Sequence, residues 1–383
     1  MTPRIPFNCP TAVGNEATYL AQALASGHIS GDGAFTKRCQ VLLESSLGAP
    51  RVLLTSSCTH ALEMAALLLD LQPGDEVAVP SFTFVSTVNA FVLRGARPVF
   101  VDIRPDTLNL DEQQLERAIS SRTRAIVVVH YAGIACEMDT ISSIAARHGI
   151  PIVEDNAHGL FGRYRGRWLG TLGSLATLSF HETKNYTCGE GGALIINDPH
   201  LIARAEILRE KGTNRSRFFR GEVDKYTWVD LGSSYLPSDL SAAMLLGQLE
   251  KQDDVQARRK EIFNRYMEGL SEWAHTSGVG LPQIPSDCTP AYHLFYLLLP
   301  DELTRDRFIE WLDGKGVHSV FHYVPLHSSP MGRRYGYANG DLPVTEAVGG
   351  RLVRLPFFFS LSHAQQDYVV EAARAFRIVG PGD

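Results

Sequence analysis

The sequence predicts an α/β protein with a mainly parallel central sheet, helices on both faces of that sheet, and a smaller C-terminal α+β domain. The chain has 383 residues, too many for one small domain. Between about residues 50 and 200, short β-rich runs alternate with helical segments, which is typical of βαβ units. These runs are almost entirely apolar, as expected of strands whose two faces are both covered.

The elements of the first domain follow in order along the chain. Strands are expected at Arg51–Thr55, Glu76–Val79, Arg97–Val101, Ala125–Val129, Pro151–Val153, Leu175–Ser179 and Ala193–Ile196. Helices are expected at Thr59–Leu69, Thr83–Leu93, Glu112–Ile119, Thr140–Arg147 and Leu201–Glu210. We assign residues 1–240 to this large domain, including an N-terminal arm.

Residues 241–383 are expected to form the smaller domain, because helical and strand patterns mix there. A long helical stretch runs from Ser238 to about Leu270. Further on we expect strands at Tyr292–Leu299 and His318–Val320 and helices at Arg305–Lys315 and Ala364–Phe376. Before this domain, Lys211–Tyr235 has no clear periodicity and is longer than an ordinary connection, which predicts a functional or partly structured loop.

The composition excludes several classes of protein. Hydrophobic residues make up 44% and charged residues 20%, so the chain can bury a sizeable core. The net charge is −6 and no long Lys/Arg run occurs, which argues against nucleic acid or an anionic membrane as partner. Apolar runs are too short to span a bilayer, and Met1–Pro10 lacks the features of a signal peptide. We therefore expect a cytoplasmic protein with reduced thiols.

Polar and aromatic segments fall at the C-terminal ends of the predicted strands, where ligands bind in a doubly wound sheet. In residues 55–59, hydroxyl groups and backbone N–H groups open a helix and suit a phosphate, although a simple Ser/Thr cap is the alternative. In residues 80–85, Phe82 and Phe84 offer a flat face to a ring cofactor, or pack in the core.

Two ionisable residues complete this pattern. Asp155 directly follows an apolar strand, so it needs either a helix to cap or a cationic partner such as a protonated pyridine nitrogen. Lys184 lies one short turn past another strand, before a glycine-rich return, and is placed to form a Schiff base with an aldehyde. Partial burial and nearby positive groups should lower its pKa. We call residues 55–59 the phosphate cup. Along the chain this cup is followed by an aromatic residue, then Asp155, then Lys184, and this order resembles that of the fold type I enzymes that use pyridoxal 5′-phosphate (PLP).

At Asp155, Ser179–His181 and Thr183–Asn185, the sequence resembles the sugar aminotransferases of the DegT/DnrJ/EryC1/StrS family, and the resemblance covers nearly the whole chain. Within the family, the likeness is greatest to members that form dTDP-4-amino-4,6-dideoxygalactose. Further segments carry it: Gly31–Gly33, Val52–Thr55, Ser57–Thr59, Asn89–Ala96, His130–Gly133, Lys211–Ser216 and Lys225–Trp228.

The resemblance implies a role for each residue of the site. Lys184 would bind PLP covalently and move a proton between the substrate and the cofactor. Asp155 would pair with the pyridinium nitrogen, His158 would lie near the phenolic oxygen, and Phe84 would stack on the ring. The phosphate would be held by Ser57, Cys58 and Ser179.

One segment departs from the family pattern. Members often contain Gly-Tyr-Asn-Tyr-Arg, in which the Asn reaches the phosphate of the partner subunit. Here residues 232–236 read Gly-Ser-Ser-Tyr-Leu. Ser234 still offers one hydrogen bond, whereas Leu236 cannot replace Arg. A homodimer with shared active sites remains the expectation.

The implied reaction transfers an amino group from L-glutamate to the 4-keto group of a nucleotide-linked deoxy sugar. The expected acceptor is dTDP-4-keto-6-deoxy-D-glucose, giving dTDP-4-amino-4,6-dideoxy-D-galactose for a cell-surface polysaccharide such as enterobacterial common antigen or lipopolysaccharide. Another keto sugar nucleotide, reaction at C3, or a non-catalytic PLP-binding regulator are the alternatives. Lysine at position 184, where related dehydratases have histidine, favours transamination.

Substrate contacts are expected at two places. Arg215, Arg220 and Lys225 lie in the aperiodic segment and are candidates for the diphosphate, with a solvated basic loop as the alternative. His322, Tyr323 and His327 should face the cleft from the small domain. The histidine spacings match no zinc signature, so we expect no metal.

Overall fold

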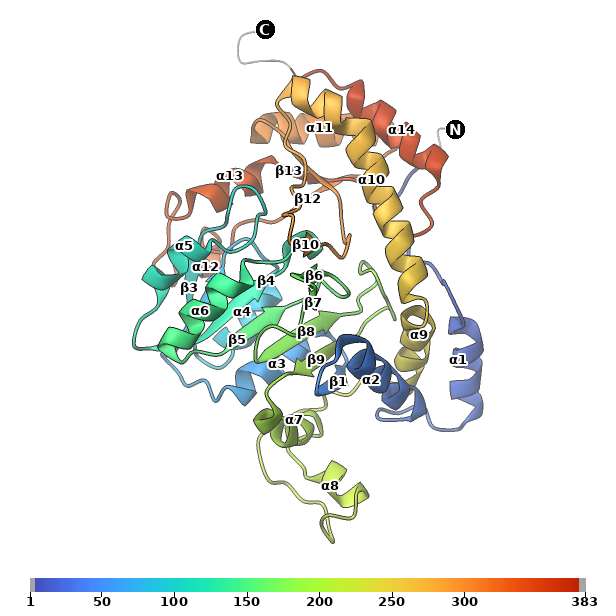
Figure 1. The fold of residues 1–383 in the computed structure, drawn as a ribbon, viewed down its shortest axis with the longest axis vertical. Helices are drawn as coiled ribbons and strands as arrows, with labels where there is room; N and C mark the ends of the chain where they lie inside the picture. Colours follow the sequence, from blue (N-terminus) through green and yellow to red (C-terminus); the bar gives the residue numbers. More distant parts are fainter. Residues whose placement is uncertain (1–3, 379–383) are drawn as a thin grey trace.

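Seven strands form the central sheet, in the order β1-β9-β8-β5-β4-β2-β3 (Figure 1). The structure is a computed structural model that describes residues 4–378. The strands are β1 (Arg51–Thr55), β2 (Glu76–Pro80), β3 (Arg97–Val101), β4 (Thr123–Val129), β5 (Ile152–Asp155), β8 (Leu175–Ser179) and β9 (Gly192–Ile196). β9 runs antiparallel to β1 and β8, and the other pairs are parallel. The C-terminal ends of β1, β2, β4, β5 and β8 therefore meet at one edge.

Helices cover both faces because strand side chains alternate between two apolar cores. In β1, Leu53 packs in one core, and Val52 and Leu54 pack in the other. The first face is covered by α3 (Cys58–Leu68), α4 (Val85–Val92) and α7 (Ile202–Arg209). The second face is covered by α2 (Ala34–Leu47), α5 (Glu112–Leu115), α6 (Met138–His148) and α9 (Asp239–Leu249).

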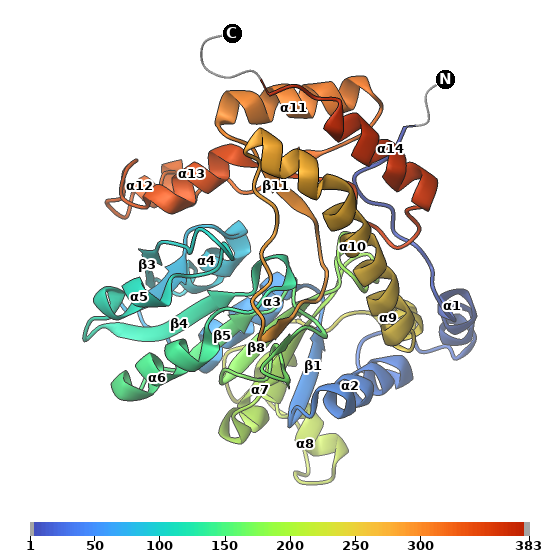
Figure 2. The same cartoon turned by 45° about the horizontal axis from the view of Figure 1, so that its top comes forward.

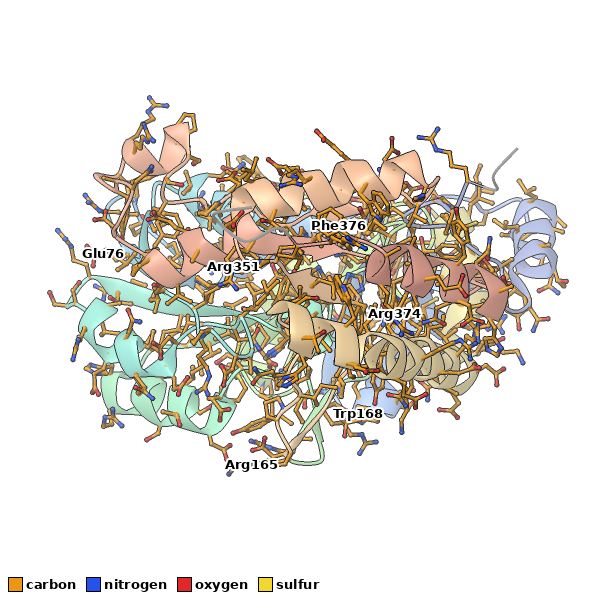
Figure 3. The ribbon with its side chains drawn as sticks, turned by 90° about the horizontal axis from the view of Figure 1, so that it is seen from above. Glu76, Arg165, Trp168, Arg351, Arg374 and Phe376 are labelled. Carbon is orange, nitrogen blue, oxygen red and sulfur yellow. The ribbon has the colours of Figure 1, made fainter. Side chains whose placement is uncertain are left out.

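Short elements connect these layers. Against α9 packs α1 (Glu16–Ala25). Three 3-10 helices are η1 (Glu116–Ala118), η2 (Tyr131–Gly133) and η3 (Pro199–Leu201). A second sheet joins β6 (Arg163–Tyr164), β7 (Arg167–Trp168) and β10 (Cys288–Thr289). Figure 3, seen from above, places Arg165 and Trp168 of the β6–β7 hairpin at one side of the molecule.

The C-terminal elements surround a small antiparallel sheet in the order β11-β13-β12. Its strands are β11 (Tyr296–Leu298), β12 (Val320–Phe321) and β13 (Leu352–Arg354). The helices are α10 (Gln252–Ser277), α11 (Glu302–Gly314), α12 (Pro330–Arg333), α13 (Pro343–Arg351) and α14 (His363–Arg374). α10 runs from beside α9 up to α11 and α14 (Figure 2). Ile5 of the N-terminal arm joins their apolar core and bridges to Val317.

The predicted fold class is confirmed, and most predicted elements lie within a few residues of their observed bounds. Two elements differ. The helical stretch from Ser238 is two helices, α9 and α10, that meet at Glu250–Lys251. The strand expected at Tyr292–Leu299 is reduced to β11, because Tyr292 has a positive φ of 49° and the backbone N–H of His293 donates to Ala132 O.

Helices α1 and α2 were not predicted, although α2 carries a readable signal. Its buried residues Phe35, Cys39, Leu43 and Leu47 recur every fourth position, which is the period of one helix face.

The division at residue 240 stays a prediction. The buried residues of α9 share a core with β1 and β9, and Cys288, Leu294 and Val348 share a core with α6. Within residues 4–378, no helix is both long and apolar enough to cross a membrane.

Candidate active site

A cavity of about 470 Å³ opens at the edge where the parallel strands end. Side chains at or just after the strand ends line this cavity, because parallel strands bring their C-terminal ends together. The predicted residues that line the cavity are Ser57, Cys58, Phe84, Asp155, His158, Ser179, Lys184 and His322. Segments far apart in the sequence thus form one site.

Lys184 follows β8 by a single turn, in which its backbone N–H donates to His181 O at 2.9 Å. The pKa of the amine is lowered to about 8, mainly because the side chain is buried. Cys58 and Asp155 oppose this shift, and the positive charge of Arg354 adds to it. The predicted lowering of this pKa is confirmed. A larger fraction of the amine is therefore neutral near pH 8, which is the form that attacks an aldehyde.

Asp155, the last residue of β5, is buried and lines the cavity. Thr87 of α4 donates its hydroxyl to Asp155 Oδ2 at 2.6 Å, and Thr83 lies 2.8 Å from the Thr87 hydroxyl. Because Thr87 uses its proton on the carboxylate, the Thr83 hydroxyl must be the donor to Thr87. Burial raises the pKa of Asp155, and a cation placed against this carboxyl group would lower it.

The phosphate cup is formed by the residues that open α3. Ser57 is the N-cap of this helix and accepts a hydrogen bond from His60 N at 3.1 Å, so the Ser/Thr cap is present, whereas phosphate binding by this segment stays a prediction. The first amides of this helix, starting at Cys58, are free of helical partners and suit an anion. A Cβ atom on Gly192 would lie 2.4 Å from Cys58 N, so β9 approaches the cup closely because residue 192 is glycine. Burial raises the pKa of the Cys58 thiol, which leaves its backbone N–H as the useful group.

Phe84 precedes α4 and remains 58% exposed although its ring is apolar. The ring lines the cavity beside Thr83 and Thr87. By contrast, Phe82 is buried and packs against Tyr131 and Tyr323. Phe82 therefore packs in the core, whereas Phe84 offers an open face to the cavity.

A stack of three imidazoles forms another wall of the cavity. The ring of His158 lies 4.1 Å from that of His293, at 24°, and 6.1 Å from that of His322. Burial lowers the pKa of all three well below the usual value for histidine, so these rings are neutral at pH 7. His158 Nδ1 is buried without a hydrogen-bond partner.

Asn185 fixes the tautomer of His293. Its Nδ2 donates to Ala291 O at 2.7 Å, so its Oδ1 must accept the hydrogen bond of 2.9 Å from His293 Nδ1. Arg259 donates to the carbonyl groups of Tyr292 and His293, which holds this segment beside the lysine turn.

These groups fit PLP part by part. The helix N-terminus with Ser57 suits the phosphate, and the buried Asp155 suits a pyridinium nitrogen. Lys184 suits the aldehyde, and the exposed face of Phe84 suits the ring. The unpartnered His158 Nδ1 and the raised pKa of Asp155 are both features that a bound polar ring would satisfy.

The structure does not bring five predicted residues to this cavity. His327 is buried between Ser81 Oγ, at 2.8 Å, and Glu346 Oε1, at 2.9 Å, so the expectation that it faces the cleft is corrected. Arg220 pairs with Glu206 at 2.8 Å and with Glu222 at 2.6 Å.

The remaining three lie in the exposed segment after α7. Arg215 opens α8 (Arg215–Phe219), near Glu210 at 3.7 Å, and Lys225 is exposed in the loop beyond this helix. Ser234 is exposed, and its backbone bridges to Glu210. In Figures 1 and 2, α8 projects away from the sheet, and Arg215, Lys225 and Ser234 are not among the residues that line the cavity.

Four residues in or beside the cavity lining were missed by the sequence analysis: Thr87, Asn185, His293 and Arg354. Tyr323, expected at the cleft beside His322, does line the cavity. Thr87 carried a signal, because it lies one helical turn after Thr83 at a strand end. His293 and Arg354 carried none, since each belongs to a short apolar segment remote in sequence from the strand ends.

The chain matches the model of the DegT/DnrJ/EryC1/StrS aminotransferase family over residues 10–374. The chain belongs to this family. It is 33% identical over 378 residues to the spore coat polysaccharide biosynthesis protein SpsC of Bacillus subtilis, covering 97% of this chain and 96% of SpsC.

Two solved structures superpose on nearly the whole chain. The aminotransferase TlmJ from Streptoalloteichus hindustanus is 33% identical with a TM-score of 0.89, covering 97% of this chain and 98% of TlmJ. The PLP form of Spr1654 from Streptococcus pneumoniae, to which a sugar aminotransferase activity is ascribed, is 28% identical with a TM-score of 0.90, covering 97% and 98% of the two chains.

The predictions of an enzyme and of its cofactor are confirmed: this family member is a PLP-dependent aminotransferase. The described part of the chain contains no group of three or more His, Cys, Asp or Glu side chains arranged to hold a metal ion.

Proposed function

We propose that this aminotransferase transfers the amino group of L-glutamate to the C4 ketone of a nucleotide-linked deoxy sugar. The proposed acceptor is dTDP-4-keto-6-deoxy-D-glucose, and the product is dTDP-4-amino-4,6-dideoxy-D-galactose. The observation that carries the proposal is that Lys184, whose pKa is lowered, lines the same cavity as Asp155 and the phosphate cup. The family resemblance supports the sugar acceptor, and the names of SpsC and Spr1654 agree with it.

The residues of the chain divide the work of this reaction. When bound, PLP supplies a ring that withdraws electrons from the reacting carbon. Ser57, Ser179 and the backbone N–H of Cys58 would hold the phosphate, and Phe84 would lie against the ring. Asp155, oriented by Thr87, would keep the ring nitrogen protonated.

Lys184 would carry the proton of the reaction. Its neutral Nζ would take the α-proton of the amino donor and would later give up that proton. The same amine acts in the reverse direction when the keto sugar replaces the keto acid, which gives a ping-pong cycle. The neutral imidazoles of His158, His293 and His322 add no charge to compete with the Lys184 amine.

We also propose that the protein is a homodimer with shared sites. The segment from α8 to Leu231 exposes Phe219 to 68% and Trp228 to 77%, which is costly for an isolated surface. In a dimer this segment would reach the partner's cavity, so Arg215, Arg220, Lys225 and Ser234 remain candidates for phosphate or diphosphate contacts across the interface. A cell-surface polysaccharide pathway and a cytoplasmic location remain predictions from the sequence.

The test is direct. Purified protein with PLP, L-glutamate and dTDP-4-keto-6-deoxyglucose should yield an amino sugar nucleotide, identified by mass spectrometry and by NMR of the new stereocentre. A product aminated at C3, or a product formed only from another keto sugar nucleotide, would replace the proposed acceptor. Absence of any amino-group transfer, with PLP still bound, would favour a non-catalytic role.

The covalent anchor is tested separately. Borohydride reduction of the wild type should label the peptide that contains Lys184. The Lys184→Ala variant should take no label and lose transamination by at least about 1,000-fold, because both the anchor and the proton carrier are gone. A label on another peptide would overturn the assignment of Lys184.

A further inference from the structure

Arg354 is a cation in the active-site cavity without an anionic partner. It is the last residue of β13, and its side chain lines the cavity together with Tyr323, Phe357 and Lys184. Within residues 4–378, no carboxylate lies within ion-pairing distance of it, although most of the other partly buried arginines have one. A charge held in a cavity without a partner is costly unless a ligand supplies one.

The hydrogen bonds of Arg354 leave its guanidinium largely unused. Its Nη2 donates to Phe321 O at 3.3 Å, at the long end of the range for a hydrogen bond. Its Nε is buried and has no acceptor. Phe7 of the N-terminal arm lies against the guanidinium, with the ring centre 4.7 Å from Cζ. The Phe7 ring covers the flat face of the guanidinium, so its N–H groups remain as the part that can donate hydrogen bonds.

Arg354 also lies on the side of the cavity where the reaction occurs. It lines the cavity together with Lys184 and the stacked His158 and His322, and its charge contributes to lowering the pKa of all three. The start of α3 offers donors of its own for the cofactor phosphate, so Arg354 is left for a different anion.

The chemistry of the two substrates identifies this anion. In an amino acid, the carboxylate is attached to the carbon that reacts, so it must lie next to Lys184. In the sugar nucleotide, the negative diphosphate is attached at C1, across the ring from the C4 ketone. A planar guanidinium binds a carboxylate through two parallel hydrogen bonds, and Arg354 lines the cavity with most of its N–H groups unused.

We propose that Arg354 binds the α-carboxylate of the amino donor and so selects amino acids over other amines. This inference rests on the proposed aminotransferase function and names the residue that recognises its first substrate. In the second half of the reaction, sugar hydroxyl groups occupy the same position and accept hydrogen bonds from Arg354.

The test separates binding of the two substrates. Glutarate carries the carboxylates of glutamate but no amino group, so it binds without reacting, and its affinity for the holoenzyme is measured by titration calorimetry. Arg354→Gln should weaken glutarate binding by roughly 10- to 100-fold. Arg354→Lys should retain part of the affinity, because the charge remains while the paired hydrogen bonds are lost. The affinity for dTDP should change less than about twofold.

Arg265→Gln is the matched control, because this arginine pairs with Asp367 on the surface, outside the cavity. It should leave glutarate binding unchanged. Unchanged glutarate affinity in Arg354→Gln would overturn the proposal, and so would an equal loss of glutarate and dTDP affinity, which would assign Arg354 to the diphosphate.

A measurement on the wild type covers the case in which the variants do not fold. The uncharged diamide of glutarate has nearly the same shape, so the wild type should bind glutarate at least about 10-fold more tightly. Equal affinities would overturn the proposal.

The choice of donor is tested in single turnovers, in which L-glutamate and other L-amino acids are mixed with the holoenzyme and the cofactor absorbance is followed. If another amino acid converts the cofactor and glutamate does not, glutamate is wrong as the donor. The requirement for Arg354 must then hold for that other amino acid.

Discussion

At the scale of single residues, the site gathers groups that would be costly in an ordinary core. Asp155 is buried with a raised pKa, Lys184 is buried with a lowered pKa, and His158 has a buried nitrogen without a partner. Buried ionisable groups of this kind are found where a bound ligand supplies their partners, so their position at strand ends indicates a ligand site. Asp155 and Lys184 could be predicted because one lies at the end of an apolar strand and the other one turn past such an end. Arg354 could not, because nothing near it in the sequence shows that its strand reaches the cavity.

The lowered pKa of Lys184 predicts the pH dependence of cofactor uptake by the apoenzyme. Only the neutral amine attacks the aldehyde, so the rate constant should rise with pH and level off above about 8, the pKa of the buried amine. An exposed lysine would continue to gain rate toward its model value of 10.5. Stopped-flow absorbance with PLP at a series of pH values gives the midpoint, and a rise that continues past pH 10 would contradict the burial of this amine.

Replacing Asp155 by Asn should leave the cofactor bound but weaken its chemistry. An amide cannot stabilise the protonated ring nitrogen as a carboxylate does, so kcat should fall on the order of 100- to 1,000-fold, or about 3–4 kcal/mol. Cofactor content by absorbance should stay near that of the wild type. The control Asp287→Asn removes a carboxylate that pairs with Arg165 on the surface and should change kcat less than about twofold.

At the scale of elements, distant segments are joined by caps as well as by strand pairing. Asp239 at the start of α9 accepts hydrogen bonds from Thr36 N at 2.8 Å and from Phe35 N at 3.2 Å, at the start of α2. Gly33 permits this approach, since a Cβ there would lie 2.3 Å from the Asp239 carboxylate. This link explains why α2 was missed: its cap is supplied about two hundred positions away, so the usual local start signal is absent.

Removing this cap should destabilise the protein without touching the cavity. Asp239→Ala leaves buried N–H groups unsatisfied and should lower the free energy of unfolding by about 1–3 kcal/mol. Urea denaturation followed by circular dichroism would show a lower midpoint. Asp239→Asn keeps an acceptor oxygen and should lose less than half as much. A midpoint equal to that of the wild type in Asp239→Ala would show that the cap contributes little.

At the scale of the whole molecule, the site depends on chain segments from the N-terminal arm to β13. Phe7, Ser57, Asp155, Lys184 and Arg354 line one cavity although they span most of the chain. The C-terminal elements therefore complete a site that the large sheet begins. Figure 3 shows the same relation from above, with Arg351 and Phe376 among the C-terminal elements that lie over the sheet.

The exposed aromatic segment predicts the behaviour of the protein in solution. We expect a dimer by light scattering, with Phe219 and Trp228 buried against the partner. Changing both to Ser should shift the mass toward the monomer at micromolar concentration. The control Leu303→Ser, at a residue 69% exposed on α11, should leave the mass unchanged. A monomeric wild type would contradict the proposal of shared sites.

The sequence by itself determined the α/β class, the sheet strands and the residues that follow them, because apolar runs and strand-end motifs are local properties of the chain. Tertiary structure alone decided that His293 and Arg354 enter the cavity and that His327 does not, because these placements depend on how the C-terminal strands pack over the sheet. The physical reason is the same in each case. Local periodicity specifies an element, whereas the partners of a buried polar group are specified by contacts between elements that no local pattern records.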